Sequence, residues 1–346
     1  MKSIVLSPFS MLYGAAVSLR NACFDAGLLR SELVPCPIIS VGNITVGGSG
    51  KTPFAAYVVS ELVERARRPV ILSRGYGGTI RGPHEVRPLD SVLDVGDEAI
   101  MQAKRLHPAV KTVIARDRVA GARYVVEENI GDVIVLDDGF QHRYLDRDID
   151  VLLIDVTSQT TVDAILNNDL LPGGPIREPL SSALKRAHVI VLVRRDTLSP
   201  EFEVDPRLLD RLGDIPTFKY WIRPIEFVDI ATGASKRLDA FQGQKCSAIT
   251  AIANGERFFN MLEALGVELV YRKAFSDHHL FTVVDWAEVQ REGSGPILMT
   301  AKDAVKLDTY ARVPDKAFVL RISGEFATID ERQRFWKIVT RATRIN

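Results

Sequence analysis

The sequence predicts an α/β fold, in which a mostly parallel sheet covered by helices is followed by a second, smaller α/β unit. Three observations predict it. Short apolar runs alternate with stretches of helical periodicity, a glycine-rich loop separates the first such run from the first such helix, and the alternation restarts after about residue 240. Strands that alternate with helices are typical of parallel sheets with both faces covered.

Length and composition exclude several classes of protein. The chain has 346 residues with 44 basic and 44 acidic side chains, and at roughly 100–200 residues per domain it suits two domains. The balanced charge and average composition exclude a disordered tail protein and a basic nucleic-acid-binding chain, so we expect no nucleic acid. We infer no obligate protein partner. Its three cysteines (Cys23, Cys36 and Cys246) lack a C-x-x-C spacing, which excludes a cysteine zinc site and suits a reducing compartment.

The first unit is predicted from buried strands and the helices between them. We expect strands at Pro37–Val41, Pro69–Ser73, Thr112–Ala115, Val133–Leu136, Val151–Ile154 and Val189–Val193. We expect helices near Phe54–Arg65, Glu98–Leu106 and Arg118–Glu128.

A change of pattern marks the end of that unit. The segment Phe218–Ile230 is rich in β-forming residues and broken by Pro224, which predicts a two-stranded linker. Strands then follow at Ser247–Ala251, Val267–Tyr271, Ile297–Thr300 and Phe318–Arg321, with helices at Phe258–Leu265 and Trp286–Arg291. The predicted regions are an N-terminal helix (1–30), a first domain (31–215), a β-ribbon linker (216–240) and a C-terminal α/β domain (241–346).

The N-terminal stretch Ser3–Leu19 is uncharged, but Pro8 and Gly14 interrupt it. As a helix it would extend about 26 Å, short of the roughly 30 Å hydrocarbon core of a bilayer. Three interpretations remain open: an amphipathic helix on a membrane surface, a helix packed on the domain, or a signal peptide. The basic residues Lys2, Arg20 and Arg30 suit the membrane surface, where each adds about 1 kcal/mol near anionic lipid.

The strongest local signal is the stretch Val41–Thr52, which follows a strand and opens a helix. Glycines let the backbone N–H groups of such a loop surround phosphate oxygens. Lys51 is expected to reach the β- and γ-phosphates, and the Thr52 hydroxyl to bind Mg²⁺. The residues expected to bind ATP are Thr45, Val46, Gly47, Gly48, Ser49, Gly50, Lys51 and Thr52. The fold is therefore expected to be P-loop NTPase-like, although Thr45 stands where the strict pattern has glycine.

Two further acidic pairs are candidate site residues. Asp137 and Asp138 follow an apolar strand at its carboxyl end, where ligands of open α/β sheets bind, and we expect them to hold Mg²⁺. Asp97 opens a predicted helix, so it is either an N-cap or a base that accepts the proton of an acceptor hydroxyl. Glu98 is then expected near the metal.

These motifs are similar to those of the tetraacyldisaccharide 4′-kinases, the lipid A 4′-kinases of Gram-negative bacteria. The matching stretches span nearly the whole chain: Val41–Pro53, Ser73–Gly78, Gly96–Glu98, Asp137–His142, Leu171–Pro179, Ala253–Phe258, Phe275–His279 and Thr300–Asp303. Thr45 is also the residue that this family carries. Gly174, Ile176 and Gly255 differ from the residues we expect there, but none of these differences removes a chemical group.

The resemblance implies transfer of the γ-phosphoryl group of ATP to the 4′-hydroxyl of tetraacyldisaccharide 1-phosphate, giving lipid IVA. It implies ATP and Mg²⁺ as cofactors and a peripheral location on the cytoplasmic face of the inner membrane, where the lipid disaccharide resides. By resemblance, the catalytic residues are Asp97, His278, Lys51 and Arg177. The metal-binding residues are Thr52, Glu98, Asp137 and Asp138, and the substrate-binding residues are Asn43, Arg74, His142 and Glu178.

Structural roles remain open for several of these residues. His142 could bond nearby backbone, and the Arg177–Glu178 pair could be a surface ion pair. Lys302–Asp303 and Asn254–Phe258 could shape the second domain. One rival function is a membrane-associated P-loop ATPase switch of the partition or metal-insertion type, although that class usually carries a lysine where this chain has Val46. The other is a non-catalytic nucleotide-binding scaffold.

Overall fold

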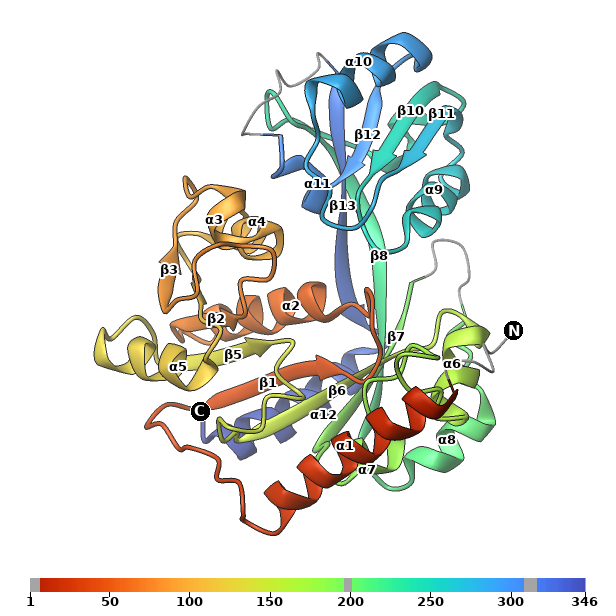
Figure 1. Ribbon diagram of the computed structural model, residues 1–346. Coiled ribbons are helices and arrows are strands. Elements are labelled where there is room, and N and C mark those ends of the chain that lie inside the picture. The colour runs from red at the N-terminus through yellow and green to blue at the C-terminus, as the bar shows by residue number, and fades with distance from the viewer. Residues whose placement is uncertain (1–6, 196–200, 308–315, 346) are drawn as a thin grey trace.

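The computed structural model describes residues 7–195, 201–307 and 316–345, which form two α/β lobes that share one continuous sheet (Figure 1). In the described part of the chain this sheet has 13 strands, in the order β11-β10-β12-β13-β8-β7-β6-β1-β5-β2-β4-β3, with β9 paired to β8. The mostly parallel α/β fold predicted from the sequence is confirmed. The second lobe continues the sheet of the first.

The first lobe holds the parallel strands β7-β6-β1-β5-β2-β4, with β3 antiparallel at the edge. Their bounds are β1 (Ile38–Asn43), β2 (Pro69–Ser73), β3 (His84–Val86), β4 (Lys111–Ile114), β5 (Val133–Asp137), β6 (Ile149–Asp155) and β7 (Val189–Arg194). The central strands are apolar in nearly every position because helices cover both faces. In β5, for example, Val133 and Val135 face one core cluster, and Ile134 and Leu136 face another.

Helices of the first lobe lie on the two faces of this sheet. They are α2 (Lys51–Glu64), α3 (Val92–Val95), α4 (Asp97–Leu106), α5 (Arg118–Glu127), α6 (Gln159–Leu166), α7 (Leu180–Leu184) and α8 (Pro206–Leu212). One core cluster packs α2 against the sheet, and separate clusters pack α5 and α6–α8 against the opposite face. The strand β1 therefore leads into the glycine-rich loop and α2 above a rigid apolar base.

A long antiparallel ribbon joins the lobes, formed by β8 (Thr217–Asp229) and β13 (Ala317–Phe326). The prediction that Phe218–Ile230 holds both strands of the linker was wrong, because this segment is a single strand. Its partner comes from the end of the chain, about a hundred residues later, and the pairing shifts register between Arg321 and Ile322, opposite Pro224. A proline lacks the N–H that a regular ladder needs, so the bulge accommodates it.

The second lobe is the smaller α/β unit. It comprises β9 (Ser235–Lys236), η2 (Leu238–Phe241), β10 (Lys245–Thr250), α9 (Gly255–Ala264), β11 (Glu268–Ala274), α10 (Val283–Glu292), β12 (Ile297–Thr300) and α11 (Ala301–Ala304). Strands β11, β10, β12 and β13 are parallel. The short helix α11 and the start of α9 lie at the carboxyl ends of their preceding strands, and this end faces the first lobe (Figure 1).

The last helix, α12 (Ile329–Thr343), returns to the first lobe, although the sequence-based division grouped it with the second. Phe335, Trp336 and Val339 join the core cluster that contains Phe54 of α2. Ring centroids of Phe54 and Phe335 lie 5.7 Å apart in an edge-to-face arrangement. The division near residue 240 stays a prediction. The packing of α12 places the end of the described chain on the first lobe.

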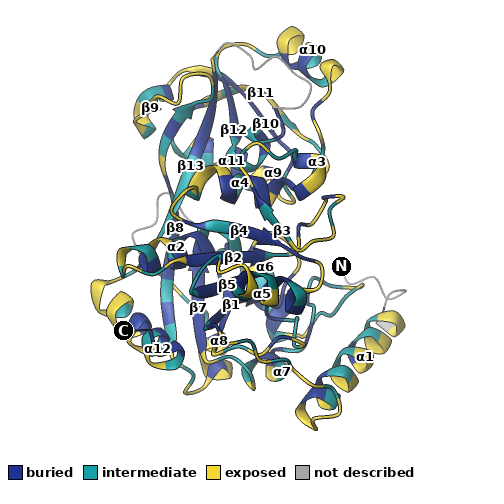
Figure 2. Ribbon diagram, turned by 90° about the vertical axis from the view of Figure 1, so that its left-hand side faces the viewer, coloured by how far each residue is buried: buried dark blue, intermediate teal, exposed yellow. Residues whose placement is uncertain are grey.

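Helix α1 (Ser7–Asp25) combines two of the interpretations left open by the sequence. One face packs on the first lobe, where Tyr13 donates a 2.9 Å hydrogen bond to the Arg177 carbonyl and Phe24 is buried. The other face exposes four large apolar side chains by 59–75% (Phe9, Met11, Leu12 and Leu19), as Figure 2 shows along α1. Residues 1–6, including Lys2, lie outside the described part. No helix in that part is sufficiently long and apolar to cross a membrane.

Candidate active site

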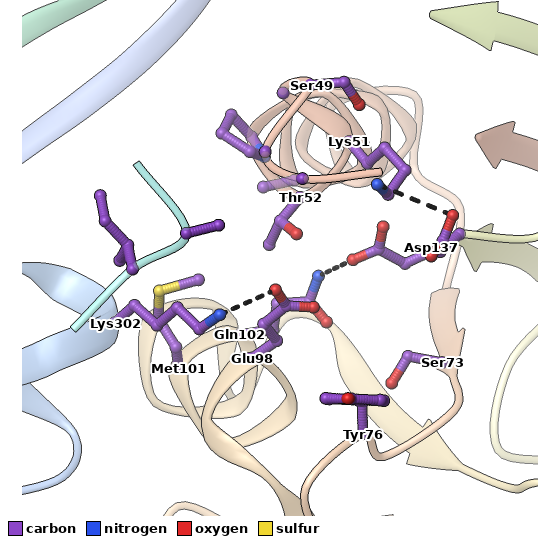
Figure 3. Close-up of a pocket in the computed structure, with 18 of the residues that line it drawn as sticks. Ser49, Lys51, Thr52, Ser73, Tyr76, Glu98, Met101, Gln102, Asp137 and Lys302 are labelled. Carbon is purple, nitrogen blue, oxygen red and sulfur yellow. Dashed lines mark hydrogen bonds and ion pairs between the residues drawn. The ribbon is translucent and has the colours of Figure 1, made fainter. Parts of the chain in front are cut away.

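A cavity of about 1020 Å³ lies between the two lobes. Its walls are the glycine-rich loop and the start of α2, helix α4, the carboxyl end of β5, and the segments of the second lobe that begin α9 and α11. Figure 3 shows Lys51, Asp137, Gln102, Glu98 and Lys302 around one side of it. Residues far apart in the sequence thus surround one space.

The glycine-rich loop has the geometry that a phosphate cradle needs. Gly50, at the N-cap of α2, has a φ of +89°, and a Cβ there would lie 2.6 Å from Ile222, so glycine is required. Lys51 Nζ donates a 3.3 Å hydrogen bond to Asn43 Oδ1 and lies 3.7 Å from Asp138 Oδ1. Residues Gly47–Thr52 line the cavity and can direct backbone N–H groups into it.

The first two residues of the predicted ATP-binding stretch, Thr45 and Val46, contact the segment that carries Arg177. Thr45 forms an isolated β-bridge with Ile176, and the Val46 N–H donates to the Pro175 carbonyl at 2.8 Å. Asn43 is fully buried, and its amide donates to Thr45 at 2.8 and 2.9 Å. These contacts fix the base of the loop on the segment that carries Arg177, and substrate contact by Asn43 stays a prediction.

Asp137 and Asp138 differ in their electrostatic surroundings. Burial, with Glu98 and Asp138 nearby, raises the pKa of Asp137 to about 7. Asp138 lies between two cations, 2.9 Å from Arg177 and 3.7 Å from Lys51. Burial acts to raise the pKa of Asp138, but these two cations outweigh it and lower the pKa. The site therefore holds one carboxylate that is neutralised by adjacent cations, Asp138, and one whose pKa burial and neighbouring carboxylates raise despite the charge of Lys51, Asp137.

Asp97 of the first lobe meets His278 of the second. Their side chains form a 2.9 Å hydrogen bond between Asp97 Oδ2 and His278 Nδ1, and Asp97 is only 4% exposed. Gly96 is the N-cap of α4 and Asp97 its first residue, so the N-cap interpretation of Asp97 was wrong. His278 has a φ of +64°, an uncommon conformation outside glycine, and such strain is often found at functional sites.

Two lysines of the second lobe also face Asp97. Lys306 Nζ lies 3.6 Å and Lys302 Nζ 3.8 Å from Asp97 Oδ2, and Lys302 also lies 3.3 Å from Glu98 and from Asp277. Burial acts to lower the pKa of Lys302, but Glu98, Asp97 and Asp277 raise it above its usual value. The second lobe thus supplies positive charge to the acidic start of α4.

The donor set fits a magnesium ion that is shared with phosphate oxygens. Asp137 Oδ1 and Ser49 Oγ are buried and have no hydrogen-bond partner among the described residues, and carboxylate and hydroxyl oxygens are ligands that Mg²⁺ prefers. Across residues 7–195, 201–307 and 316–345, no three His, Cys, Asp or Glu side chains form a cluster that could hold a metal alone. Mg²⁺ at kinase sites is usually bound by one or two carboxylates plus phosphates and water, so a small protein ligand set suits it.

Comparisons with known proteins agree with this arrangement. The family model described as tetraacyldisaccharide-1-P 4′-kinase matches residues 2–343. The chain is 39% identical over 326 residues to a tetraacyldisaccharide 4′-kinase of Anaeromyxobacter dehalogenans, covering 90% of this chain and 84% of that one. It is 35% identical over 308 residues to the one of Shewanella woodyi, covering 89% and 82%. The chain belongs to the tetraacyldisaccharide-1-P 4′-kinase family.

A solved structure agrees in fold. The kinase resembles the "apo" form of LpxK from Aquifex aeolicus in complex with ATP, with a TM-score of 0.77 and 31% identity over 98% of each chain. The resemblance stated from the sequence is confirmed, and so is the kinase function. The alternative of an ATPase switch is not favoured.

The predicted substrate-binding residues of the kinase fall into two groups. Arg74 and His142 line the cavity, and burial lowers the pKa of His142 to about 4. Glu178 is only 1% exposed, and its carboxylate accepts hydrogen bonds from Asn21, Gln141 and Arg186. It joins α1 to the first lobe beside a separate cavity of about 200 Å³, so its contacts are with protein.

Sequence reasoning left several residues of the kinase site without a firm role. Lys302, which it allowed to be structural, lies in the site, and Arg257 contacts the glycine-rich loop. Gln102, which donates a 2.7 Å hydrogen bond to Asp137, and Lys306 were not singled out. Lys302 and Arg257 belong to stretches that resemble the family, Thr300–Asp303 and Ala253–Phe258, and this resemblance was the sequence signal that could have placed them in the site. Lys306 follows Lys302 by one helical turn, but nothing in the sequence shows that this face meets α4.

Proposed function

We propose that this kinase transfers the γ-phosphoryl group of ATP to the 4′-hydroxyl of a tetraacylated glucosamine disaccharide 1-phosphate, forming lipid IVA. The observation that carries the proposal is the Asp97–His278 hydrogen bond, which spans the lobes beside the loop bearing Lys51. A nucleotide site alone serves a hydrolase or a switch equally well. A buried carboxylate–histidine pair in the same cavity supplies the general base that takes the proton from an acceptor hydroxyl.

In this mechanism Asp97 accepts the proton of the acceptor hydroxyl at Oδ1, which is buried and has no hydrogen-bond partner in the part of the chain that the structure describes. His278 holds the other oxygen, Oδ2, and so fixes the orientation of the carboxylate. Phosphoryl transfer depends mainly on positioning and charge neutralisation, and a general base adds about 10²–10⁴-fold.

Lys51 and Arg177 supply positive charge to the phosphates. In their present contacts both face Asp138, which keeps them oriented in the cavity. Thr52, Glu98, Asp137 and Asp138 are the proposed residues around Mg²⁺. When bound, Mg²⁺ neutralises charge on the transferring phosphate oxygens. Arg74 and His142, which line the cavity, are proposed to contact the acceptor.

We further propose that the kinase binds the cytoplasmic face of the inner membrane through α1. The four exposed apolar side chains of this helix support the proposal, as does its contact with the segment of Arg177 and Glu178. An acceptor with four acyl chains remains in the bilayer, so the enzyme must work at its surface. A helix with one apolar face outward and one face docked on the protein suits that position.

The experiment measures ATP consumption by the purified kinase with and without the disaccharide 1-phosphate in mixed micelles. The proposal predicts turnover that depends on the disaccharide. Turnover at the same rate without it would indicate an ATPase switch, and ATP binding without any turnover would indicate a nucleotide-binding scaffold.

A further inference from the structure

A second contact between the lobes lies at the glycine-rich loop and comes from helix α9. Arg257 belongs to the first turn of α9, and its Nη1 donates to Asp155 Oδ2 at 3.0 Å. The same nitrogen donates to the carbonyl oxygen of Gly48 at 3.4 Å. The side chains of Arg257 and Asp155 are 24% and 5% exposed, so this ion pair is largely removed from solvent.

The local structure of the second lobe fixes the position of the backbone of Arg257. Asn254 caps α9 by accepting a 3.1 Å hydrogen bond from the backbone N–H of Arg257. Gly255 lies tightly against Thr250 and Ala274, where a Cβ would come within 2.7 Å of the Ala274 side chain. The start of α9 is therefore held firmly on β10 and β11, and Arg257 extends from it toward the first lobe.

A second arginine, Arg195 of the first lobe, acts electrostatically on Asp155. Asp155 ends β6, and its carboxylate also accepts a 2.9 Å hydrogen bond from the Thr157 N–H. Burial acts to raise the pKa of Asp155, but Arg195 and Arg257 outweigh it and lower the pKa. Arg195 lies against the loop itself, because a Cβ added to Gly48 or Gly50 would meet its guanidinium at 3.6 or 3.3 Å. Asp155 thus forms an ion pair with Arg257 and lies in the field of Arg195, and both arginines lie against the loop.

The contact with Gly48 determines the direction of a phosphate-binding N–H. In a trans peptide the carbonyl and the following N–H point in opposite directions, so holding Gly48 O also holds the N–H of Ser49. A loop of glycines has many accessible conformations and loses much entropy when it is ordered around phosphate. A charged donor that orders the peptide beforehand removes part of that cost from ATP binding.

We propose that Arg257 is a positioning residue through which the second lobe holds the glycine-rich loop in its ATP-binding form. It acts on Gly48 while Asp155 holds its guanidinium in place. The proposal rests on the proposed use of ATP as phosphoryl donor. If Arg257 has this role, the affinity for ATP depends on the Arg257 contact between the lobes and does not depend on the Asp97–His278 contact.

The test is the Arg257→Gln variant of the full-length kinase, titrated calorimetrically with ATP in the presence of Mg²⁺. A hydrogen bond from a charged donor corresponds to a factor of about ten or more in an equilibrium constant. We expect the Kd and KM for ATP to rise about tenfold, while kcat at saturating ATP falls less than about threefold, because ground state and transition state lose the same interaction. Arg257→Lys keeps the charge and should recover part of the affinity.

The matched control is Arg272→Gln. Arg272 is an exposed arginine of β11 that pairs with Glu256 and Glu263 of α9, the helix that carries Arg257. The Kd of this variant for ATP should stay within about twofold of wild type. If wild type binds ATP and Arg257→Gln binds equally well, the inference is wrong, even if the melting temperature falls. A loss of kcat with unchanged Kd would also overturn it, because Arg257 would then act on the transferring group. Failure of wild type to bind ATP would instead refute the proposed function.

If Arg257→Gln does not fold, the same titration on Arg257→Lys decides the question. Lysine has a compact ammonium and lacks the fork of the guanidinium, so it cannot reproduce both contacts equally. We expect about a threefold higher Kd for ATP than wild type. An unchanged Kd would overturn the inference.

Discussion

Replacing Asp97 with asparagine tests the proposed base with little change of shape. Asparagine keeps the size of the side chain and an oxygen that can accept a hydrogen bond, but it removes the charge and the ability to take a proton. Three basic groups surround the carboxylate: His278 at 2.9 Å, Lys306 at 3.6 Å and Lys302 at 3.8 Å. The variant therefore changes both the chemistry and the charge balance of the cavity.

The expected magnitudes follow from these contacts. Loss of a general base lowers kcat by about 10²–10⁴-fold, which is about 3–5 kcal/mol in activation free energy. Leaving a buried charge without its partner costs about 3–5 kcal/mol of stability. In the variant Lys306 still has Asp303 as an ion-pair partner, and Lys302 still has Glu98. We therefore expect a loss of stability below that range. ATP binding should change less than about threefold, because Asp97 lies outside the glycine-rich loop.

The assay combines steady-state phosphorylation of the disaccharide 1-phosphate with calorimetric titration of ATP and thermal unfolding. Asp94→Asn is the matched control, since Asp94 is an exposed carboxylate three residues before Asp97 whose side chain bonds Thr79. Its kcat should equal that of wild type within about twofold. An Asp97→Asn variant that folds and retains more than about a tenth of wild-type kcat would refute the reasoning.

Three further predictions concern the metal, the membrane and pH. Asp138→Asn should raise the Mg²⁺ concentration for half-maximal activity about tenfold, and an unchanged Mg²⁺ titration would exclude Asp138 from the metal site. The double variant Leu12→Ser/Leu19→Ser should reduce co-sedimentation with anionic vesicles at least threefold while its activity in detergent stays the same; equal sedimentation would remove α1 as the anchor. The pKa of His142 is about 4 in the folded protein against 6.5 normally, so the unfolded state binds more protons between these values and stability falls as pH drops through that window. His142→Gln should flatten this dependence in urea unfolding at pH 7 and pH 4.5, and an equally steep loss would contradict the assignment.

Local patterns allowed much of the first lobe to be predicted. Alternating apolar runs and helical periods depend on neighbouring residues, so strands such as Val133–Asp137 and helices such as Lys51–Glu64 lie close to their expected positions. The glycine-rich loop and the paired Asp137 and Asp138 were recognisable because each is a short motif next to a strand. The parallel arrangement then required both to lie at the same edge of the sheet.

Long-range contacts explain what the sequence could not reveal. The pairing of β8 with β13 joins segments about a hundred residues apart, and α12 packs on Phe54 of α2, which lies much farther away in the sequence. Glu178 is buried partly because Asn21 of α1, which is far from it in the sequence, donates a hydrogen bond to its carboxylate. The lysines around Asp97 depend on how the lobes meet, which no local pattern encodes.

The most direct test of the account is to identify the product that the purified kinase makes from γ-labelled ATP and tetraacyldisaccharide 1-phosphate. Mass spectrometry and phosphorus NMR establish whether the label is on the lipid and on which oxygen. The account predicts one new phosphate monoester, on the 4′-oxygen of the distal sugar, in a yield that matches the ATP consumed. Label recovered only as inorganic phosphate, or on another oxygen, would contradict it.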